Sequence, residues 1–469
     1  MKKLLSENIT VQLIFLSLVV FLSRLPFLYA GFGVEEDSWL LAITAKNIAE
    51  SGVYEMSRAP AHPVQELVYA LMYHNGLFAF GTNLLSAVSS VIAIIFFALS
   101  LKHLGFKHYL FASFAFAFTP VVFISSTYTI DYMLAMTLVM GSFCLLLKEK
   151  ILLAGILLGL AIGFRITSGA MLIPFCFLLL PISKNLKDIL ILTFATGLVG
   201  FLTYLPVIKT YELSFFTFAD QFPYPNLPKV LYKATIGVFG TVGLITILFF
   251  AVLLLARKVS TKEKIVVSKM PVKLFWASVA VIIIYIISYL RLPQKSAYFI
   301  PTIPFIILLL GYFLTSRTFN VFCVLMTMSS FLFSVNITDS LRGSAHSALA
   351  IKFTMAGQEI FIDPLTGPIF SDYTKRLNKI AFTEKVFQKT RNEKKKVLLI
   401  CGWWCNELLV RNWNCEQNQN VLLAFYIDKI AMVNYISDGY EIFYLPEQNL
   451  YNDQYSNMNF TDSIAKPYM

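Results

Sequence analysis

The sequence predicts an α-helical membrane protein with many spans, followed by a small C-terminal α/β domain. Hydrophobic residues make up 57% of the 469 residues and charged residues only 14%, whereas a soluble globular chain carries roughly a quarter charged residues. Apolar runs long enough to cross a bilayer recur along residues 1–340, and residues 341–469 contain none. We therefore expect a transmembrane domain over 1–340 and a soluble domain over 341–469.

The apolar runs predict about eleven transmembrane helices, because each has the length that a bilayer requires. They lie near residues 11–30, 83–102, 108–126, 131–147, 150–164, 169–182, 188–207, 234–256, 272–290, 298–315 and 318–336. Two of these runs, 150–164 and 169–182, are short, and we interpret them as half-spans that meet at Arg165. Segment 64–80 is apolar as well, and it predicts either an additional span or a helix that lies in the membrane–water interface.

The distribution of Lys and Arg predicts a cytoplasmic N-terminus, because short cytoplasmic loops are enriched in these residues. The residues that then share the cytoplasmic side are Lys2, Lys3, Lys102, Lys107, Lys148, Lys150, Lys184, Lys187 and the run 257–273. The exoplasmic side receives residues 31–82, 128–131, 208–233, 291–297 and everything after 337. Short basic loops between the apolar runs account for much of the net charge of +11. We therefore expect the lipid bilayer as a partner and no nucleic acid. No cleavable signal peptide is evident.

Residues 341–469 read as a small α/β domain, exoplasmic in this orientation. Short strand-like runs at 397–400, 421–427 and 441–445 are separated by helical patterns. Cys405 and Cys415 either pair in a disulfide or remain free thiols, since an exoplasmic domain permits pairing.

Three carboxylates follow the first predicted span directly. They are Glu35, Glu36 and Asp37. The stretch from Asp37 to Gly52 carries one apolar stripe and reads as an amphipathic helix on the membrane surface. Two interpretations of Asp37 stay open: it caps this helix, where a carboxylate accepts backbone N–H bonds and suits the dipole, or it acts as a general base at the membrane surface.

A second polar group, Arg58, His62 and Glu66, lies in the same exoplasmic loop. Pro60 and Pro63 predict an extended, rigid segment between two helices. A guanidinium held at the interface is suited to bind phosphate. The alternative is a basic loop that faces lipid headgroups.

Polar residues also lie at the ends of later spans. Asp131 begins a span, where it is either a helix cap or a buried group that binds a sugar hydroxyl or a cation. Arg165 lies at membrane depth and must find a partner or reach water, so structural ion pairing and anion binding are both open. Arg291 and Lys295 lie in a tight exoplasmic turn before Tyr298, against the positive-inside trend, which indicates an anionic ligand.

This arrangement resembles the GT-C superfamily of polytopic glycosyltransferases, in particular the protein O-mannosyltransferases and the bacterial lipid A aminoarabinose transferase. Asp37 stands at the position of their catalytic aspartate, counted back from residues 51–52, with Ser38 where many members have Glu. Whether Glu35 or Glu36 substitutes for that Glu stays open.

Other segments carry the same resemblance. Residues 58–63 look like the R-x-P-G-x-P loop of these enzymes, with Ala61 where Gly is usual. Arg165 lies in a turn where relatives often have Lys or Arg, and residues 291–301 look like their R-x-x-Y-x-x-P segment near the donor phosphate. The resemblance covers roughly residues 10–315 and leaves the tail unexplained.

The resemblance implies a GT-C fold and an inverting transfer of a sugar from a polyprenyl-phosphate donor to an exoplasmic acceptor, which is a glycolipid, a polysaccharide or a protein. Asp37 would deprotonate the acceptor, and the leaving phosphate would lie near Arg165, Arg291 or Lys295. The other residues expected at the donor are Arg58, His62, Glu66, Asp131 and Tyr298. Many relatives need no metal for the chemistry, and a divalent cation, where one is used, would lie among Glu35, Glu36, Asp37 and Asp131. The implied location is a bacterial inner membrane.

Two other function classes stay open, a transporter and a polysaccharide polymerase or ligase. A transporter typically has repeated halves and broken helices at the midplane, whereas no repeat is visible here and the charges lie on one face. A polymerase or ligase is expected to have its Arg and His residues in a large late loop, whereas here the charged loop is the first.

Overall fold

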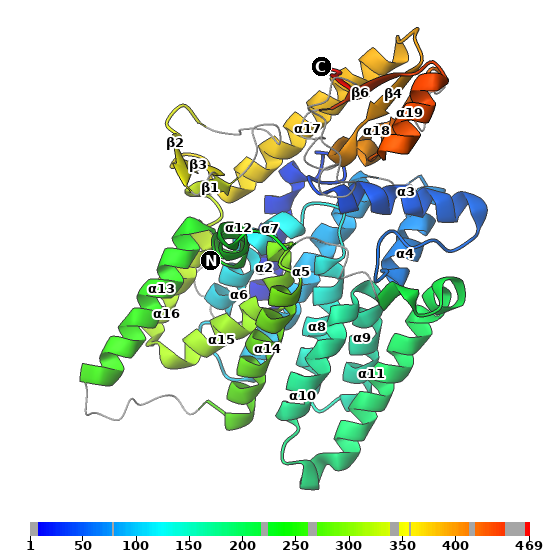
Figure 1. Ribbon diagram of the computed structural model, residues 1–469. Helices are drawn as coiled ribbons and strands as arrows, with labels where there is room; N and C mark the ends of the chain where they lie inside the picture. Colours follow the sequence, from blue (N-terminus) through cyan, green and yellow to red (C-terminus); the bar gives the residue numbers. More distant parts are fainter. Residues whose placement is uncertain are drawn as a thin grey trace.

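The computed structural model describes residues 8–76, 79–216, 224–260, 270–337, 347–355, 358–411, 418–445 and 465–469. A bundle of long helices forms the larger part, and a mixed α/β region lies at one end of it (Figure 1). Two helices, α3 and α4, lie between these parts. The predicted class, a mostly helical membrane protein with a C-terminal α/β region, is confirmed.

Six helices are long and apolar enough to cross a membrane, within the described ranges. They cover Ile9–Phe27, Phe80–His103, Asn185–Tyr211, Ile236–Ala256, Val272–Arg291 and Ser296–Phe313. Three shorter apolar helices cover Tyr132–Leu147, Ile151–Phe164 and Ile166–Leu178. The chain is therefore a multi-pass integral membrane protein, and the larger number of about eleven spans stays a prediction.

The bundle consists of the following helices: α2 (Ile9–Arg24), η1 (Leu25–Phe27), α5 (Phe80–His103), α6 (Tyr109–Ala117), α7 (Pro120–Ser125), α8 (Tyr132–Leu147), α9 (Ile151–Phe164), η2 (Ile166–Met171), α10 (Leu172–Leu178), α11 (Ile182–Tyr211), η3 (Ser214–Phe216), α12 (Leu227–Ala234), α13 (Ile236–Ser260), α14 (Val272–Arg291), η5 (Ser296–Thr302), α15 (Ile303–Phe313) and α16 (Ser316–Met328).

Two predicted single spans differ from the structure. The run 108–126 forms two helices, α6 and α7, because Pro120 has no N–H to continue a helix and instead begins α7. The run 318–336 also ends early, since α16 stops at Met328 and strand β1 begins at Ser334. The predicted junction at Arg165 is confirmed: α9 ends at Phe164, and Arg165 has an extended backbone before η2.

Segment 64–80 does not form a spanning helix. Its helix α4 covers Pro63–His74, 12 residues, which is about 18 Å at 1.5 Å per residue and shorter than the ~30 Å hydrocarbon core. Helix α3 (Glu36–Ser51) packs against α4 and ends at Gly52, whose φ of +69° suits glycine. Both helices lie across one end of the bundle (Figure 1).

Three glycines let α9 approach α11 closely. A Cβ added at Gly155, Gly159 or Gly163 would lie 2.7, 2.6 or 2.5 Å from the nearest side-chain atom of a neighbouring element. At Gly159 that atom is Cβ of Val199 on α11. Small residues at every fourth position are a common way to pack membrane helices. This contact fixes the end of α9, from which Arg165 extends.

The C-terminal region has two sheets. Strands β1 (Ser334–Ile337), β3 (Gln358–Asp363) and β2 (Ile351–Met355) form an antiparallel sheet in that order. Strands β5 (Val421–Ala424), β4 (Val397–Ile400), β6 (Glu441–Tyr444) and β7 (Lys466–Pro467) form a parallel sheet, with the fully buried β4 inside. The three predicted strands are thus confirmed. Strand β1 precedes the predicted domain boundary at residues 340–341, whereas its partner β3 follows it. The first sheet therefore contains residues from both predicted domains.

The remaining elements of the C-terminal region are helices. They are α17 (Pro368–Arg391), η6 (Gly402–Trp404), α18 (Cys405–Arg411) and α19 (Lys429–Ser437). Cys405 is buried, and Cys415, its predicted disulfide partner, lies outside the described residues. Ile369 at the start of α17 belongs to the hydrophobic core of the bundle, so this helix joins the two parts.

We expect Gly159→Ala to lower the thermal unfolding temperature, since the new methyl group has no space and overpacking costs about 1–3 kcal/mol. Gly197→Ala on α11 is the control, because its Cβ would meet no atom within 4 Å and alanine favours a helix. Thermal unfolding of both variants in detergent gives the comparison. Equal stability of the two variants would contradict close packing at Gly159.

Candidate functional site

Five of the predicted site residues form one cluster where α3 and the following loop meet the bundle. Asp37 comes from the first turn of α3, Arg58 from the loop before α4, Asp131 from the start of α8, Arg165 from the end of α9 and Lys295 from the turn before η5. The segments that supply them are distant in sequence, and the ion pairs between them hold the segments together.

The Asp131 carboxylate is the centre of the cluster and is fully buried. Arg58 Nη2 donates to its Oδ1 at 2.8 Å, and Arg165 Nη1 donates to its Oδ2 at 2.6 Å. Asp131 occupies the N-cap position of α8 but makes no capping hydrogen bond. Burial raises the pKa of Asp131, but its cationic neighbours outweigh this effect and hold the pKa well below its usual range. The carboxylate is therefore ionised.

Asp37 faces the same cations rather than capping α3. Glu35 is the N-cap residue, and Asp37 Oδ2 accepts a hydrogen bond from Lys295 Nζ and lies 3.3 Å from Arg58 Nε. Burial raises the pKa of Asp37, but Lys295 and Arg58 lower it by more, so the pKa lies well below its ordinary value. Lys295 Nζ also donates to Glu35, to which Tyr128 Oη donates at 3.4 Å.

Arg165 is held between aromatic rings. Its guanidinium carbon lies 4.6 Å from the ring centroid of Tyr132 and 4.9 Å from that of Tyr298, which are cation–π distances. Tyr298 thus lies at the cluster as predicted. The aromatic contacts and the ion pair with Asp131 together fix the orientation of this guanidinium.

His62 and Glu66 bind the segments that carry Arg165 and Arg58. His62 Nδ1 lies 2.8 Å from the carbonyl oxygen of Phe164, so this nitrogen carries a proton, and 3.8 Å from Asp131 Oδ2. Burial and the charge of Arg58 lower the pKa of His62 to about 3, so the ring is neutral. Glu66 accepts hydrogen bonds from Tyr54 Oη at 2.5 Å and from both N and Oγ of Ser57, and so fixes the loop that carries Arg58.

The structure does not bring Arg291 and Glu36 into the cluster. Arg291 is exposed at the end of α14. Among the described residues it forms no ion pair with a member of the cluster. Glu36 turns toward α18, where Asn406 Nδ2 lies 3.4 Å from its Oε1.

The charges of the cluster balance, and a buried donor of Arg58 lacks an acceptor among the described residues. Glu35, Asp37 and Asp131 face the cations Arg58, Arg165 and Lys295, three negative charges against three positive. Arg58 Nη1 is buried and has no hydrogen-bond acceptor among the described residues. Because an unsatisfied buried donor is costly, this nitrogen is a position for an incoming anion.

The predicted place for a divalent cation is taken by basic side chains. Glu35, Asp37 and Asp131 each face a Lys or Arg, and Glu36 points elsewhere. In the described part of the chain, no group of three or more His, Cys, Asp or Glu residues has a metal-binding arrangement.

Two residues of α17 hold the segments that carry the cluster, and sequence reasoning did not identify them. Arg376 is buried and donates to the carbonyl oxygens of Phe27 at 3.3 Å and Thr127 at 3.0 Å. Lys379 Nζ donates to the carbonyl oxygen of Val34 at 3.1 Å. Thr127 and Val34 precede Asp131 and Asp37 by a few residues. The only sequence signal is a pair of basic residues one helical turn apart in a polar helix, which is common on any surface.

A comparison with solved structures identifies a related fold. ArnT from Cupriavidus metallidurans, in a crystal structure bound to undecaprenyl phosphate, is similar to this chain with a TM-score of 0.52 and 11% sequence identity, over 85% of this chain and 84% of that chain. The described part of the chain therefore has an ArnT-like fold. No protein-family model and no curated protein matches the chain.

We expect Asp131→Asn to destabilise the protein by about 3–5 kcal/mol at pH 7, because Arg58 and Arg165 would lose a buried counter-charge. The folded-state pKa of Asp131 lies below the unfolded value of ~3.9. The stabilisation is therefore complete above about pH 4 and is lost as the pH falls further.

Thermal unfolding of both proteins between pH 7 and pH 3 measures this difference. Asp438→Asn, at an exposed residue, is the control and should match the wild type. A stability difference that stays constant down to pH 3 would contradict the ion-pair explanation.

Proposed function

We propose that this protein is an inverting glycosyltransferase that moves a sugar from a polyprenyl-phosphate donor to an acceptor on the exoplasmic side of the membrane. The observation that supports this most strongly is the buried cluster of Asp37, Arg58, Asp131, Arg165 and Lys295 in a chain with an ArnT-like fold. The structure of ArnT was solved with undecaprenyl phosphate bound, and we extend that ligand class to this chain.

The donor phosphate would bind at Arg58 and Lys295. Among the described residues Arg58 Nη1 has no acceptor, and a guanidinium suits two oxygens of one phosphate. Lys295 is shared between Asp37 and Glu35, so it can exchange one carboxylate for a phosphate oxygen without leaving the cluster. Arg165 is pinned by Asp131 and two rings, and its role would be to hold Asp131 and add positive potential.

The transfer itself needs one base and one stabilised leaving group. The acceptor hydroxyl or amine attacks the anomeric carbon of the sugar, and the bond from this carbon to the phosphate oxygen breaks with its electron pair on that oxygen. The acceptor proton passes to the Asp37 carboxylate. The leaving polyprenyl phosphate gains one negative charge, which Arg58 and Lys295 stabilise.

The depressed pKa of Asp37 assigns Lys295 a second role in this proposal. In the resting cluster Asp37 is a weak base, because Lys295 and Arg58 hold its carboxylate ionised. A phosphate that draws Lys295 away would raise the pKa of Asp37 toward the range in which a carboxylate accepts a proton. Donor binding would therefore activate the base.

The orientation and location belong to the same proposal. A cytoplasmic N-terminus agrees with the basic loops and places the cluster and the C-terminal region on the exoplasmic side, in a bacterial inner membrane. The soluble domain would begin near residue 341.

We expect Asp37→Asn to reduce sugar transfer by at least 100-fold, since a general base contributes about 10²–10⁴-fold. The assay uses a set of polyprenyl-phosphate sugars with the protein in liposomes. Glu36→Gln is the control, because Glu36 faces Asn406, and should keep wild-type turnover. Unchanged transfer in Asp37→Asn would refute Asp37 as the base. Absence of turnover with every donor would favour the transporter or ligase classes.

Lys295→Gln should weaken the binding of polyprenyl phosphate about tenfold or more, because a charged hydrogen bond is worth about 1.5–3 kcal/mol. Arg291→Gln removes a cation from the same turn but outside the cluster and should bind the lipid as the wild type does. Quenching of intrinsic fluorescence during titration measures both. A loss in Arg291→Gln alone would place the phosphate elsewhere.

A further inference from the structure

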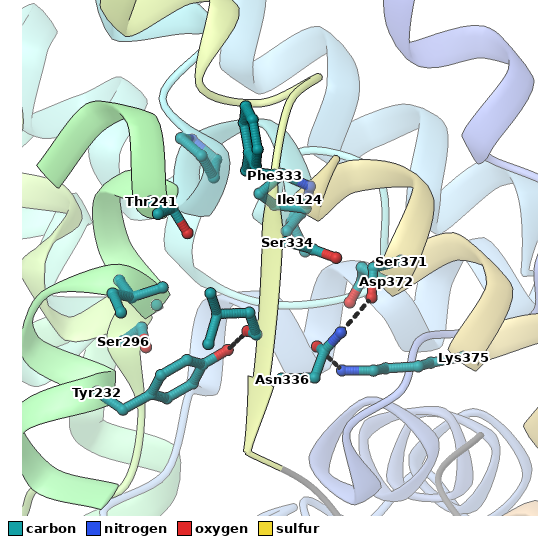
Figure 2. Close-up of a pocket in the computed structure, with 15 residues that line it drawn as sticks. Ile124, Tyr232, Thr241, Ser296, Phe333, Ser334, Asn336, Ser371, Asp372 and Lys375 are labelled. Carbon is teal, nitrogen blue, oxygen red and sulfur yellow. Dashed lines mark hydrogen bonds between the residues drawn. The ribbon is translucent and has the colours of Figure 1, made fainter. Parts of the chain in front are cut away.

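A polar pocket lies between the helical bundle and the C-terminal region. It has a volume of about 180 Å³ and lies between α7, α12, α13, η5, β1 and α17. Figure 2 shows Tyr232, Thr241 and Ser296 on one side of β1 and Ser371, Asp372 and Lys375 on the other. Ser296 directly follows Lys295, whose Cα lies about 3.8 Å away along the chain. The start of η5 therefore contributes one residue to the pocket and the preceding one to the cluster.

Two buried hydroxyl groups at this pocket lack hydrogen-bond partners among the described residues. They are Oγ1 of Thr241 and Oγ of Ser334, and Ser334 is only 2% exposed. Buried polar groups nearly always have partners. The two hydroxyls are therefore open to hydrogen bonds from a water or a ligand that enters the pocket.

The missing partner of Thr241 has a local cause. A helical Thr usually donates to the carbonyl four residues earlier, as Thr246 does to Val242 at 2.7 Å in the same helix. Gly240, with φ +68° and ψ 171°, interrupts α13 immediately before Thr241. This interruption removes the usual acceptor, so the Thr241 hydroxyl is free to bind another group. Interrupted membrane helices are a common place for substrate binding.

The remaining walls offer donors, acceptors and an aromatic ring. Asn336 Nδ2 donates to Ser371 Oγ at 3.0 Å and its Oδ1 accepts from Lys375 Nζ at 2.5 Å. Asp372 is held by Arg376 at 2.7 Å. The Tyr232 ring lines the opposite side, where its hydroxyl donates to the carbonyl oxygen of Val335 at 2.7 Å. These hydrogen bonds hold the walls in place before a ligand arrives.

This combination suits a single sugar ring. The volume of about 180 Å³ is below the ~300–1,000 Å³ of sites for drug-sized ligands. Hydroxyl, amide, ammonium and carboxylate groups can bond several sugar hydroxyls, and a tyrosine ring can cover an apolar sugar face. A phosphate is disfavoured because Asp372 lies in the wall.

We propose that this pocket binds one sugar ring of a substrate, with Thr241 and Ser334 as specificity-determining residues. The proposal rests on the proposed transferase function and extends it to the sugar. Two sources share this chemistry: the sugar of the acceptor and the sugar of the lipid-linked donor.

The test measures binding of methyl hexopyranosides to the purified full-length protein in nanodiscs by saturation-transfer NMR. The double variant Thr241→Val, Ser334→Ala removes both hydroxyls and should weaken the best glycoside about tenfold. Thr246→Val is the control, because its hydroxyl is satisfied within α13, and should bind as the wild type does. Absence of saturable binding for every glycoside, or equal binding in the double variant, would overturn the proposal.

Two further measurements make the result interpretable. The thermal unfolding temperature of the double variant must match that of Thr246→Val. If the double variant is less stable, the binding measurement uses the single variants Thr241→Val and Ser334→Ala instead. Addition of a polyprenyl-phosphate sugar then distinguishes the sources: displacement of the glycoside assigns the pocket to the donor sugar, and simultaneous binding assigns it to the acceptor. Glycoside binding without any sugar transfer would overturn the proposed function and leave the pocket assignment standing.

Discussion

The Asp131 carboxylate, buried between two guanidinium groups, is the interaction on which the arrangement of the site depends. A buried carboxylate without counter-charges is strongly destabilising, so Arg58 and Arg165 must both reach it. Arg58 can do so only if the loop before α4 folds back, and Arg165 only if α9 ends where it does. The hydrogen bonds of Glu66 to the loop and the glycines of α9 serve these two requirements.

The balance of charge in the cluster explains how the proposed phosphate site can stay stable without a ligand. Cations gathered alone in a protein interior would repel each other and lose their hydration. Here Glu35 and Asp37 neutralise Lys295 until an anion replaces one of them. In the proposed reaction the same carboxylate that stabilises the empty site becomes the base when the donor arrives. The resting and working states are then linked by the movement of one lysine side chain.

Sequence reasoning located much of the site because polar residues are rare in apolar runs and are therefore conspicuous. Asp37, Arg58, Asp131, Arg165 and Lys295 were all candidates on this ground, and the structure brings them together. Arg291 lies in the same turn as Lys295 but is exposed outside the cluster, so its role at the donor stays a prediction. Arg376 and Lys379 escaped notice, since a charged helix in a polar tail resembles any solvated helix. The pocket at Thr241 depends on five separate segments, and contacts between such segments are invisible in a single sequence.

The contacts of α17 also impose an order on the assembly of the protein. Domains form from the N-terminus onward as a chain is synthesised, and Asp37 and Asp131 emerge hundreds of residues before Arg376 and Lys379. Until residues 376–379 arrive, nothing on that helix holds the backbone at Val34 and Thr127. A nascent chain halted before this point has all the ionic groups of the cluster but lacks the clamp that aligns them. The cluster thus becomes fully held only after the last long apolar helix of the described residues has been made, so that an unfinished copy in the bilayer would lack an aligned cluster.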